Sequence, residues 1–211
     1  MKKNKRKVII LGLFLLLCGL AGCTQEENVY VPVTSNTVEA LEDGSITGYI
    51  VEPFEKDYYD VKELETMVRA EIDEYNEEKP DLTKGQGRVP ILVDKVFMTE
   101  DGSQKVVVAL NFGNPAVYQD YMGKEIFYGT LADAVTEGYD VDKKLAEVKG
   151  GKVLTGDKIQ KNGEKRILIL EEPVMVRTYQ KVQYLSAGAK LTEEGFVDCT
   201  LNEDLKYIII K

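Results

Sequence analysis

Residues 60–75 read DVKELETMVRAEIDEY, and this stretch decides the helical part of the fold. Its apolar residues recur every three or four positions, at Val61, Leu64, Val68, Ile72 and Tyr75. That spacing places them on one face of an α-helix. Asp60 is suited to the N-cap, and Glu63 follows it in a capping-box arrangement. We therefore expect a helix over about residues 60–79, ended by Pro80, with its apolar stripe against a sheet and its acidic face in water.

Strands are predicted on both sides of this helix. Residues 46–54 form an apolar stretch that ends at Pro53-Phe54. Residues 89–98 and 105–112 form two more, and the turn between them contains Asp101-Gly102, which is typical of a hairpin. Shorter elements are expected further on: helical segments at 115–121 and 131–137, a strand at 125–128, and a turn of helix at 142–148.

The C-terminal third alternates strongly and predicts further strands. Asn162-Gly163 separates residues 158–161 from residues 164–171, which is the sequence signal of a second hairpin. One long strand is expected over residues 174–185. Strands at 196–200 and 206–210 close the chain, and the apolar run Tyr207-Ile208-Ile209-Ile210 predicts that the last strand is paired inside a sheet.

Together these elements predict an α+β fold, with a mostly antiparallel sheet, one main amphipathic helix packed on it, and short helices besides. Residues 1–22 are assigned to an export signal. Residues 23–45 are polar and acidic and are assigned to a tether. Residues 46–211 are assigned to a single α+β domain, a length sufficient for a real core.

The N-terminus carries the clearest targeting motif. Five Lys and Arg residues stand in the first seven positions, followed by 15 mostly apolar residues from Val8 to Gly22. This is the pattern of an export signal, and the apolar run is shorter than the roughly 20 residues of a membrane-spanning helix. The four residues Leu20-Ala21-Gly22-Cys23 resemble the lipobox of bacterial lipoproteins at all four positions.

The lipobox resemblance implies lipidation of Cys23. In that class a diacylglyceryl group is attached to the cysteine sulfur, the signal peptidase cuts before the cysteine, and the new amine is often acylated, with palmitate as the expected fatty acid. Two or more acyl chains suffice for stable anchoring. The resemblance therefore implies a chain that begins at Cys23, held in the cell membrane by lipid and facing outside the cytoplasm.

Composition narrows the chemistry of the mature chain. The signal holds five of the 27 basic residues and none of the 36 acids, which leaves 22 bases against 36 acids and a net charge of −14. Such a charge disfavours nucleic acid as a partner. The chain has no His, which removes most Ser-His-Asp and Cys-His mechanisms and nearly all zinc sites. We expect no cofactor and no metal.

No catalytic residue can be assigned from the sequence. Cys199 is expected to be a buried small apolar residue, because it lies in an alternating stretch. Ser186 and Lys190 are weak candidates for a dyad, and the glycines at 85, 87, 150 and 151 do not continue into a phosphate-binding loop. Four linear acid pairs are candidates for carboxylate chemistry: Asp57/Asp60, Glu171/Glu172, Asp140/Asp142 and Glu193/Glu194. Residues 140–146 match a calcium loop only at their start.

Twelve tyrosines against six phenylalanines suit either a recognition surface or ordinary strand edges, with Tyr58, Tyr59, Tyr118, Tyr121 and Tyr128 near the predicted loops. Three functions are therefore open. The first is a non-catalytic, lipid-anchored module that binds a protein or glycan partner in the cell envelope. The second is a carboxylate-based hydrolase of cell-wall or external glycan. The third, ranked lowest, is a solute-binding lipoprotein of a transporter, which usually needs two α/β lobes and a longer chain.

Overall fold

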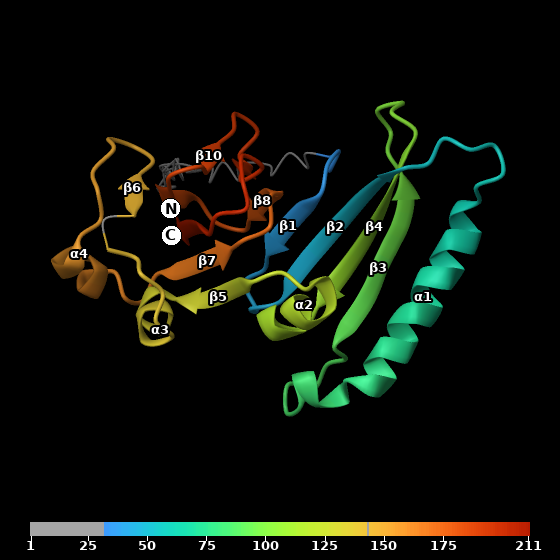
Figure 1. Ribbon diagram of the computed structural model, residues 1–211, viewed down its shortest axis with the longest axis horizontal. Helices are drawn as coiled ribbons and strands as arrows, with labels where there is room; N and C mark the ends of the chain where they lie inside the picture. The colour runs from blue at the N-terminus through green and yellow to red at the C-terminus, as the bar shows by residue number, and fades with distance from the viewer. Residues whose placement is uncertain (1–31, 143) are drawn as a thin grey trace, which may run out of the picture. The chain divides into compact units, whose positions relative to one another are not determined.

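The computed structural model describes residues 32–142 and 144–211, which form two β-sheets and four α-helices (Figure 1). The predicted α+β class is confirmed, because both sheets are mostly antiparallel and one helix is much longer than the others. The predicted export signal and Cys23 lie outside the described residues. In the part of the chain that is described, no helix is both long and apolar enough to cross a bilayer.

The larger sheet, sheet A, has seven strands in the order β10-β11-β8-β1-β2-β4-β3. All neighbours pair antiparallel except β1 and β8, which are parallel. The strands are β1 (Thr37–Ala40), β2 (Ile46–Pro53), β3 (Ile91–Met98), β4 (Lys105–Phe112), β8 (Met175–Thr178), β10 (Lys190–Leu191) and β11 (Val197–Asp198). The predicted strand at 46–54 and the hairpin of β3 and β4 are confirmed, with a register shift between Val93 and Lys95.

Helix α1 (Val61–Glu78) begins where the sequence predicts. The Asp60 carboxylate accepts hydrogen bonds from the backbone N–H groups of Lys62 and Glu63 at 2.7 and 3.1 Å. A 3-10 turn, η1 (Pro80–Thr83), follows the helix. Figure 1 shows α1 running alongside β3, the edge strand of sheet A, with β4 and β2 beyond it.

Two polar side chains of α1 bind the free backbone edge of β3. The Asn76 amide accepts from the Ile91 N–H and donates to the Ile91 carbonyl, both at 2.8 Å. Arg69 donates to the Val93 carbonyl at 3.2 Å. These contacts satisfy an edge that would otherwise be open to pairing with another chain.

The smaller sheet, sheet B, has the order β5-β7-β12-β9-β6. Its strands are β5 (Ile126–Thr130), β6 (Leu145–Glu147), β7 (Arg166–Leu170), β9 (Val182–Ser186) and β12 (Lys206–Ile210). The last strand, β12, is the central strand, as its apolar sequence predicts, and it is buried along its whole length. Three short helices complete the fold: α2 (Pro115–Met122), α3 (Leu131–Thr136) and α4 (Gly156–Lys161). The predicted helical segments at 115–121 and 131–137 are confirmed by α2 and α3, and Thr130 caps α3.

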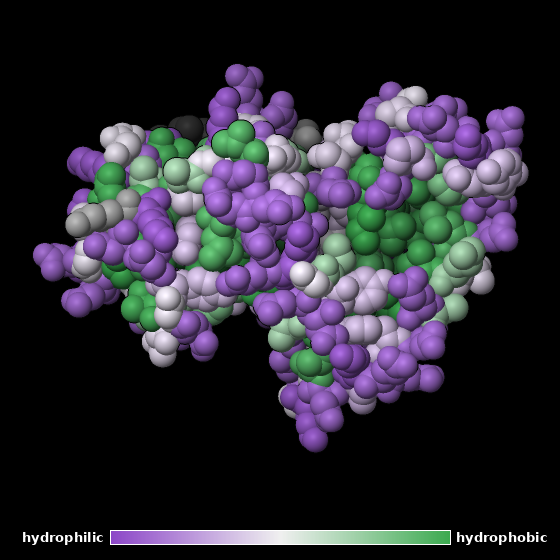
Figure 2. Space-filling view, viewed as in Figure 1, coloured by the Kyte–Doolittle hydropathy of each residue, from purple (hydrophilic) through white to green (hydrophobic). Residues whose placement is uncertain are grey.

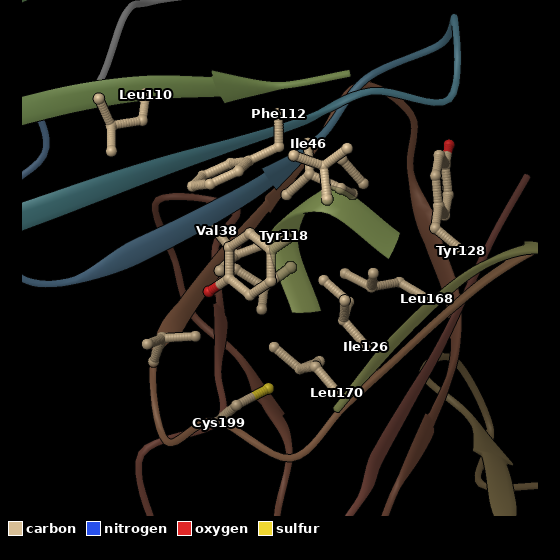
Figure 3. Packing of buried hydrophobic residues seen from close by; sticks show 14 of the residues in the cluster. Val38, Ile46, Leu110, Phe112, Tyr118, Ile126, Tyr128, Leu168, Leu170 and Cys199 are labelled. Carbon is tan, nitrogen blue, oxygen red and sulfur yellow. The ribbon is translucent and has the colours of Figure 1, made fainter. Parts of the chain in front are cut away.

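The main core joins the two sheets through α2. Figure 3 shows Tyr118 of α2 between side chains of sheet A and sheet B. The contributing residues shown include Ile46, Leu110 and Phe112 from sheet A and Ile126, Leu168 and Leu170 from sheet B. The Phe112 and Tyr118 rings stand edge to face with centroids 4.9 Å apart. A second core lies on the other face of sheet B and includes Leu131, Leu145, Leu154, Ile167 and Ile209.

The prediction of one strand over residues 174–185 is wrong. The segment contains two strands, β8 in sheet A and β9 in sheet B, separated by Tyr179-Gln180-Lys181. Thr178 Oγ1 donates to the Gln180 carbonyl at 2.7 Å and fixes the bend between them. The chain crosses from sheet A to sheet B at this bend. The alternation of apolar and polar residues continues through the bend, so the sequence pattern did not predict it.

Two further local predictions are wrong. Residues 158–161 belong to helix α4 instead of a hairpin strand, and Asn162 is its C-cap. The helix is favoured by Asp157 in its first turn and Lys158 and Lys161 in its last turn, which suit the helix dipole. Residues 145–147 form strand β6, paired with β9, where a turn of helix was expected.

The folded unit also begins earlier than predicted. Residues 23–45 were assigned to the tether, but the first strand, β1, lies within them. Residues 37–40 form β1, which lies between β2 and β8 in the middle of sheet A. Val38 and Ala40 are buried in the main core, and β1 pairs with a strand on each side. The prediction of a tether missed this strand because the residues around it are mostly polar.

Candidate binding groove

A groove of about 440 Å³ lies between α1 and the neighbouring strands of sheet A. Ile50 of β2 and Val106 and Val108 of β4 line it from the sheet, and Leu64 and Met67 line it from the helix. We call this feature the α1 groove. Its volume falls within the roughly 300–1,000 Å³ of typical ligand pockets. Figure 2 shows it as a hydrophobic hollow beside the helix.

Three aromatic rings, those of Phe54, Tyr58 and Tyr59, also line the α1 groove. The Phe54 and Tyr59 centroids are 4.8 Å apart, and the Tyr58 and Tyr59 centroids are 5.0 Å apart at nearly right angles. Eight large hydrophobic side chains are exposed in the described part of the chain, and three of them line this groove: Tyr58 at 77%, Met67 at 64% and Tyr59 at 44% exposure. Exposed apolar side chains that gather at one place mark an interaction site.

The loop that carries these rings is fixed at both ends. Phe54 N–H donates to the Gln104 carbonyl at 2.7 Å, which ties the end of β2 to the turn between β3 and β4. Tyr59 N–H donates to the Lys56 carbonyl at 3.0 Å. Asp60 then caps α1, so the rings stand on a loop held between two regular elements.

The rim of the α1 groove is negatively charged. Glu52, Asp60 and Glu63 are exposed and line it, and no Lys or Arg is among the described residues of its lining. Helix α1 as a whole carries seven carboxylates and two basic side chains. An apolar floor with an acidic rim favours a ligand that presents apolar groups together with positive charge.

A second, more polar cleft of about 670 Å³ lies beside β5. Three carboxylates line it, from Glu125, Glu137 and Asp140. The aromatic rings of Phe127 and Tyr139 also line it, with centroids 5.2 Å apart. We call this feature the β5 cleft. Burial and the nearby Glu125 carboxylate raise the pKa of Tyr139 to about 12, so its hydroxyl stays protonated and can donate a hydrogen bond at neutral pH.

The predicted tyrosine surface is divided by the structure. Tyr58 and Tyr59 lie exposed in the α1 groove, but Tyr118 is buried in the main core, where its hydroxyl donates to Glu172. Tyr121 Oη donates to Glu71 at 2.9 Å and its ring packs against Tyr75 of α1. Tyr128 is also buried and lies under the Arg166 guanidinium. Of these five tyrosines, only Tyr58 and Tyr59 are therefore exposed.

The linear acid pairs separate into different roles. Asp60 caps α1, and Glu172 accepts from Tyr118. Glu193 and Glu194 lie exposed in the turn between β10 and β11. Asp60 also lies with Glu52 and Glu63 on the rim of the α1 groove, and Asp140 lies with Glu125 and Glu137 in the β5 cleft. Asp140 also forms an ion pair of 3.4 Å with Lys144.

The candidate nucleophiles are not placed for catalysis. Cys199 is buried, as predicted, and burial raises the pKa of its thiol to about 12. Ser186 lies on β9 and its hydroxyl oxygen accepts from the Tyr207 N–H at 2.9 Å, whereas Lys190 is exposed on β10 of the other sheet. In residues 32–142 and 144–211, no group of three or more acidic or thiol side chains could hold a metal ion.

Sequence reasoning missed several members of both features. Met67 is three positions after Leu64 on α1, and this spacing could have placed it beside the predicted apolar stripe. Glu125 and Glu137 are twelve residues apart and carry no local signal of a shared site. Both line the same cleft because Glu125 directly precedes β5 and Glu137 directly follows α3.

Comparisons of the chain with protein families, with curated proteins and with solved structures give no match. The candidate site therefore rests on the geometry of the chain itself.

Proposed function

We propose that this chain is a lipoprotein, anchored in the cell membrane through Cys23 and facing outside the cytoplasm, whose folded part is a non-catalytic binding module. The lipobox at residues 20–23 supports the anchor. The α1 groove supports the binding function, and the exposure of Tyr58 and Met67 beside an apolar floor is the observation that carries it. Burying such side chains against a partner removes apolar surface from water, which stabilises the complex.

The anchor is tested by Cys23→Ala in the full-length chain in its own host. We expect the signal to remain uncut and the lipid to be absent from the mass spectrum of the purified protein. A variant that is processed and retained in the membrane like the native chain would contradict the anchor.

The groove is tested by site-specific photo-crosslinking in living cells. A benzoylphenylalanine residue is placed at Tyr58 or at Met67, and a control is placed at Leu201, which is 76% exposed and outside the groove. We expect the same discrete adduct from both groove positions and none from the control. Adducts of equal yield at Leu201, or no adduct at the two groove positions, would remove the groove as a binding surface.

A second candidate function is a carboxylate-based hydrolase of glycan, and the β5 cleft is the observation that favours it. Glu125, Glu137 and Asp140 line this cleft together with aromatic rings that suit a sugar. Glu125→Gln and Glu137→Gln should each lower release of reducing sugar from cell-wall glycan by about 100-fold or more, because each removes a proton-transfer group. The matched control is Glu203→Gln, which is exposed and outside the cleft. Glycan left intact by the native chain would exclude this function.

The third candidate, a solute-binding lipoprotein, gains no support. Such proteins usually enclose their ligand between two α/β lobes, whereas Val31–Lys211 form one compact unit.

A further inference from the structure

We infer that the partner of the α1 groove is a positively charged amphipathic segment of another protein. This inference rests on the proposed binding function and adds the chemistry of the partner. It is carried by two features that occur together at one place, an apolar floor and an acidic rim.

The apolar part of the groove suits side chains and not sugars. Ile50, Val106 and Val108 offer no hydrogen-bond donor or acceptor from their side chains, so hydroxyl groups seated on them would lose their bonds to water. Met67 adds a flexible thioether at the edge, which adapts to irregular apolar surfaces. Leucine-type or aromatic side chains of a peptide would gain by burial here.

The charged rim of the groove favours a partner of positive charge. Glu52 stands at the end of β2, and Asp60 and Glu63 stand at the start of α1, on either side of the aromatic loop. Two lysines, Lys56 and Lys62, lie nearby in the chain, but neither lines the groove. Three rim carboxylates without a lining base attract Lys or Arg and repel acidic segments.

The same charge argument disfavours the other occupants. Residues 24–31 of this chain contain the apolar Val29-Tyr30-Val31, but they also carry Glu26 and Glu27 and no base. A second copy carries the same acidic rim and the same net charge of −14 after removal of residues 1–22. Either would bring like charges together, which is destabilising.

The test measures binding of three labelled peptides to the full-length protein in nanodiscs of neutral phosphatidylcholine, with empty discs as the baseline. The peptides share leucines at helical spacing and differ only in their polar positions, which are all Lys, all Ser or all Glu. We expect the Lys peptide to bind about tenfold more tightly than the Ser peptide at low salt, and the Glu peptide to bind most weakly. The preference should shrink at about 0.5 M salt, because the rim charges are exposed and screened.

Two double variants test whether the preference for the Lys peptide comes from the rim of the groove. Glu52→Gln with Glu63→Gln should remove most of the preference for Lys over Ser while leaving binding of the Ser peptide unchanged. The control, Glu77→Gln with Glu78→Gln, removes the same charge from the far end of α1 and should preserve the preference. Because the readout is a ratio between peptides on one variant, a small loss of stability does not alter it.

The outcomes separate this inference from the proposed function. The inference of a basic partner would be wrong if the three peptides bound with equal affinity or did not bind at all. It would also be wrong if both double variants lost the preference for Lys over Ser to the same extent. The photo-crosslinks at Tyr58 and Met67 decide independently whether the groove binds a partner. If deletion of residues 24–31 strengthens binding of all three peptides equally, the chain's own segment is the occupant and the inference is wrong.

Discussion

Burial alters the properties of two reactive or charged side chains, Cys199 and Lys206. Cys199 is the clearest case, because it directly follows β11 and is buried in the main core. Burial disfavours the charged thiolate and raises the pKa of Cys199 to about 12. Lys206 is also fully buried, and its ammonium donates to the carbonyl oxygens of Asn202 and Asp204, at 3.2 and 2.5 Å. Removing these oxygen acceptors would leave the buried ammonium without partners, which is destabilising.

The thiol of Cys199 should therefore resist alkylation in the folded protein. At pH 8 we expect iodoacetamide to leave Cys199 unmodified in the native chain and to modify it fully in denaturant, because only the thiolate reacts. Peptide mass spectrometry reads this position separately from the other cysteines. Rapid labelling of Cys199 in the native state would show that this part of the core opens to solvent.

Asp43 gives stability that depends on pH. Hydrogen bonds from the Ser45 hydroxyl at 2.6 Å and the Ser45 N–H at 3.0 Å lower the pKa of Asp43, and Arg88 Nη1 adds an ion pair at 3.1 Å. A carboxyl group whose pKa is lower in the folded state stabilises the fold above its unfolded pKa, near 4. This contribution is lost as the pH falls through the lower, folded value.

We expect Asp43→Asn to reduce the free energy of unfolding at pH 7, and the difference from the native chain to narrow as the pH falls from about 4 toward 2. Urea denaturation at a series of pH values measures it. Glu42→Gln, the exposed neighbour, should show no such trend. A constant difference across the whole pH range would mean that the charge of Asp43 does not contribute.

At the scale of elements, α1 both completes a core and protects a sheet edge. Its apolar stripe contributes the buried Ile72 to the main core, while Asn76 and Arg69 bind the backbone of β3. Because the helix lies beside the edge strand, a groove remains between the helix and the apolar side chains of β2 and β4. The α1 groove is therefore a direct consequence of where the helix packs.

Asn76→Ala should cost about 2–3 kcal/mol in the free energy of unfolding, because it leaves the N–H and carbonyl of the buried Ile91 without their partner. Asn76→Asp keeps the acceptor for the Ile91 N–H and should cost less. Glu77→Ala on the exposed side of the helix is the control, expected within about 0.5 kcal/mol of the native chain. Equal stability of Asn76→Ala and Glu77→Ala would show that the edge contacts are not needed.

At the scale of the whole folded unit, the two sheets share one core. Phe112 from sheet A and Leu168 and Ile208 from sheet B belong to the same cluster, with Tyr118 of α2 between the sheets. A side chain at this junction stabilises both sheets. The unit from Val31 to Lys211 is accordingly expected to unfold in one transition.

Phe112→Leu should lower the free energy of unfolding by roughly 1–2 kcal/mol and speed amide hydrogen exchange in β4 and in β12 together. Hydrogen exchange with mass spectrometry distinguishes the two sheets. Val153→Ala, at a position with 45% exposure, should change neither. Faster exchange confined to sheet A would show that the sheets unfold separately.

The sequence by itself determined the elements whose signals are local. The α1 stripe and its Asp60 cap, the hairpin around Asp101-Gly102 and the apolar last strand are written in consecutive residues, so periodicity and turn chemistry predict them. The same is true of the burial of Cys199 within an alternating stretch.

Only the tertiary structure decided the features that depend on distant residues. Strand β1 is stabilised by neighbours at residues 46–49 and 175–178, and the segment from 174 to 185 is divided because its halves find partners in different sheets. The α1 groove and the β5 cleft likewise join residues far apart in the chain. Pairing and burial between distant segments cannot be predicted from local spacing, because these contacts stabilise the fold only when the segments meet in the folded chain.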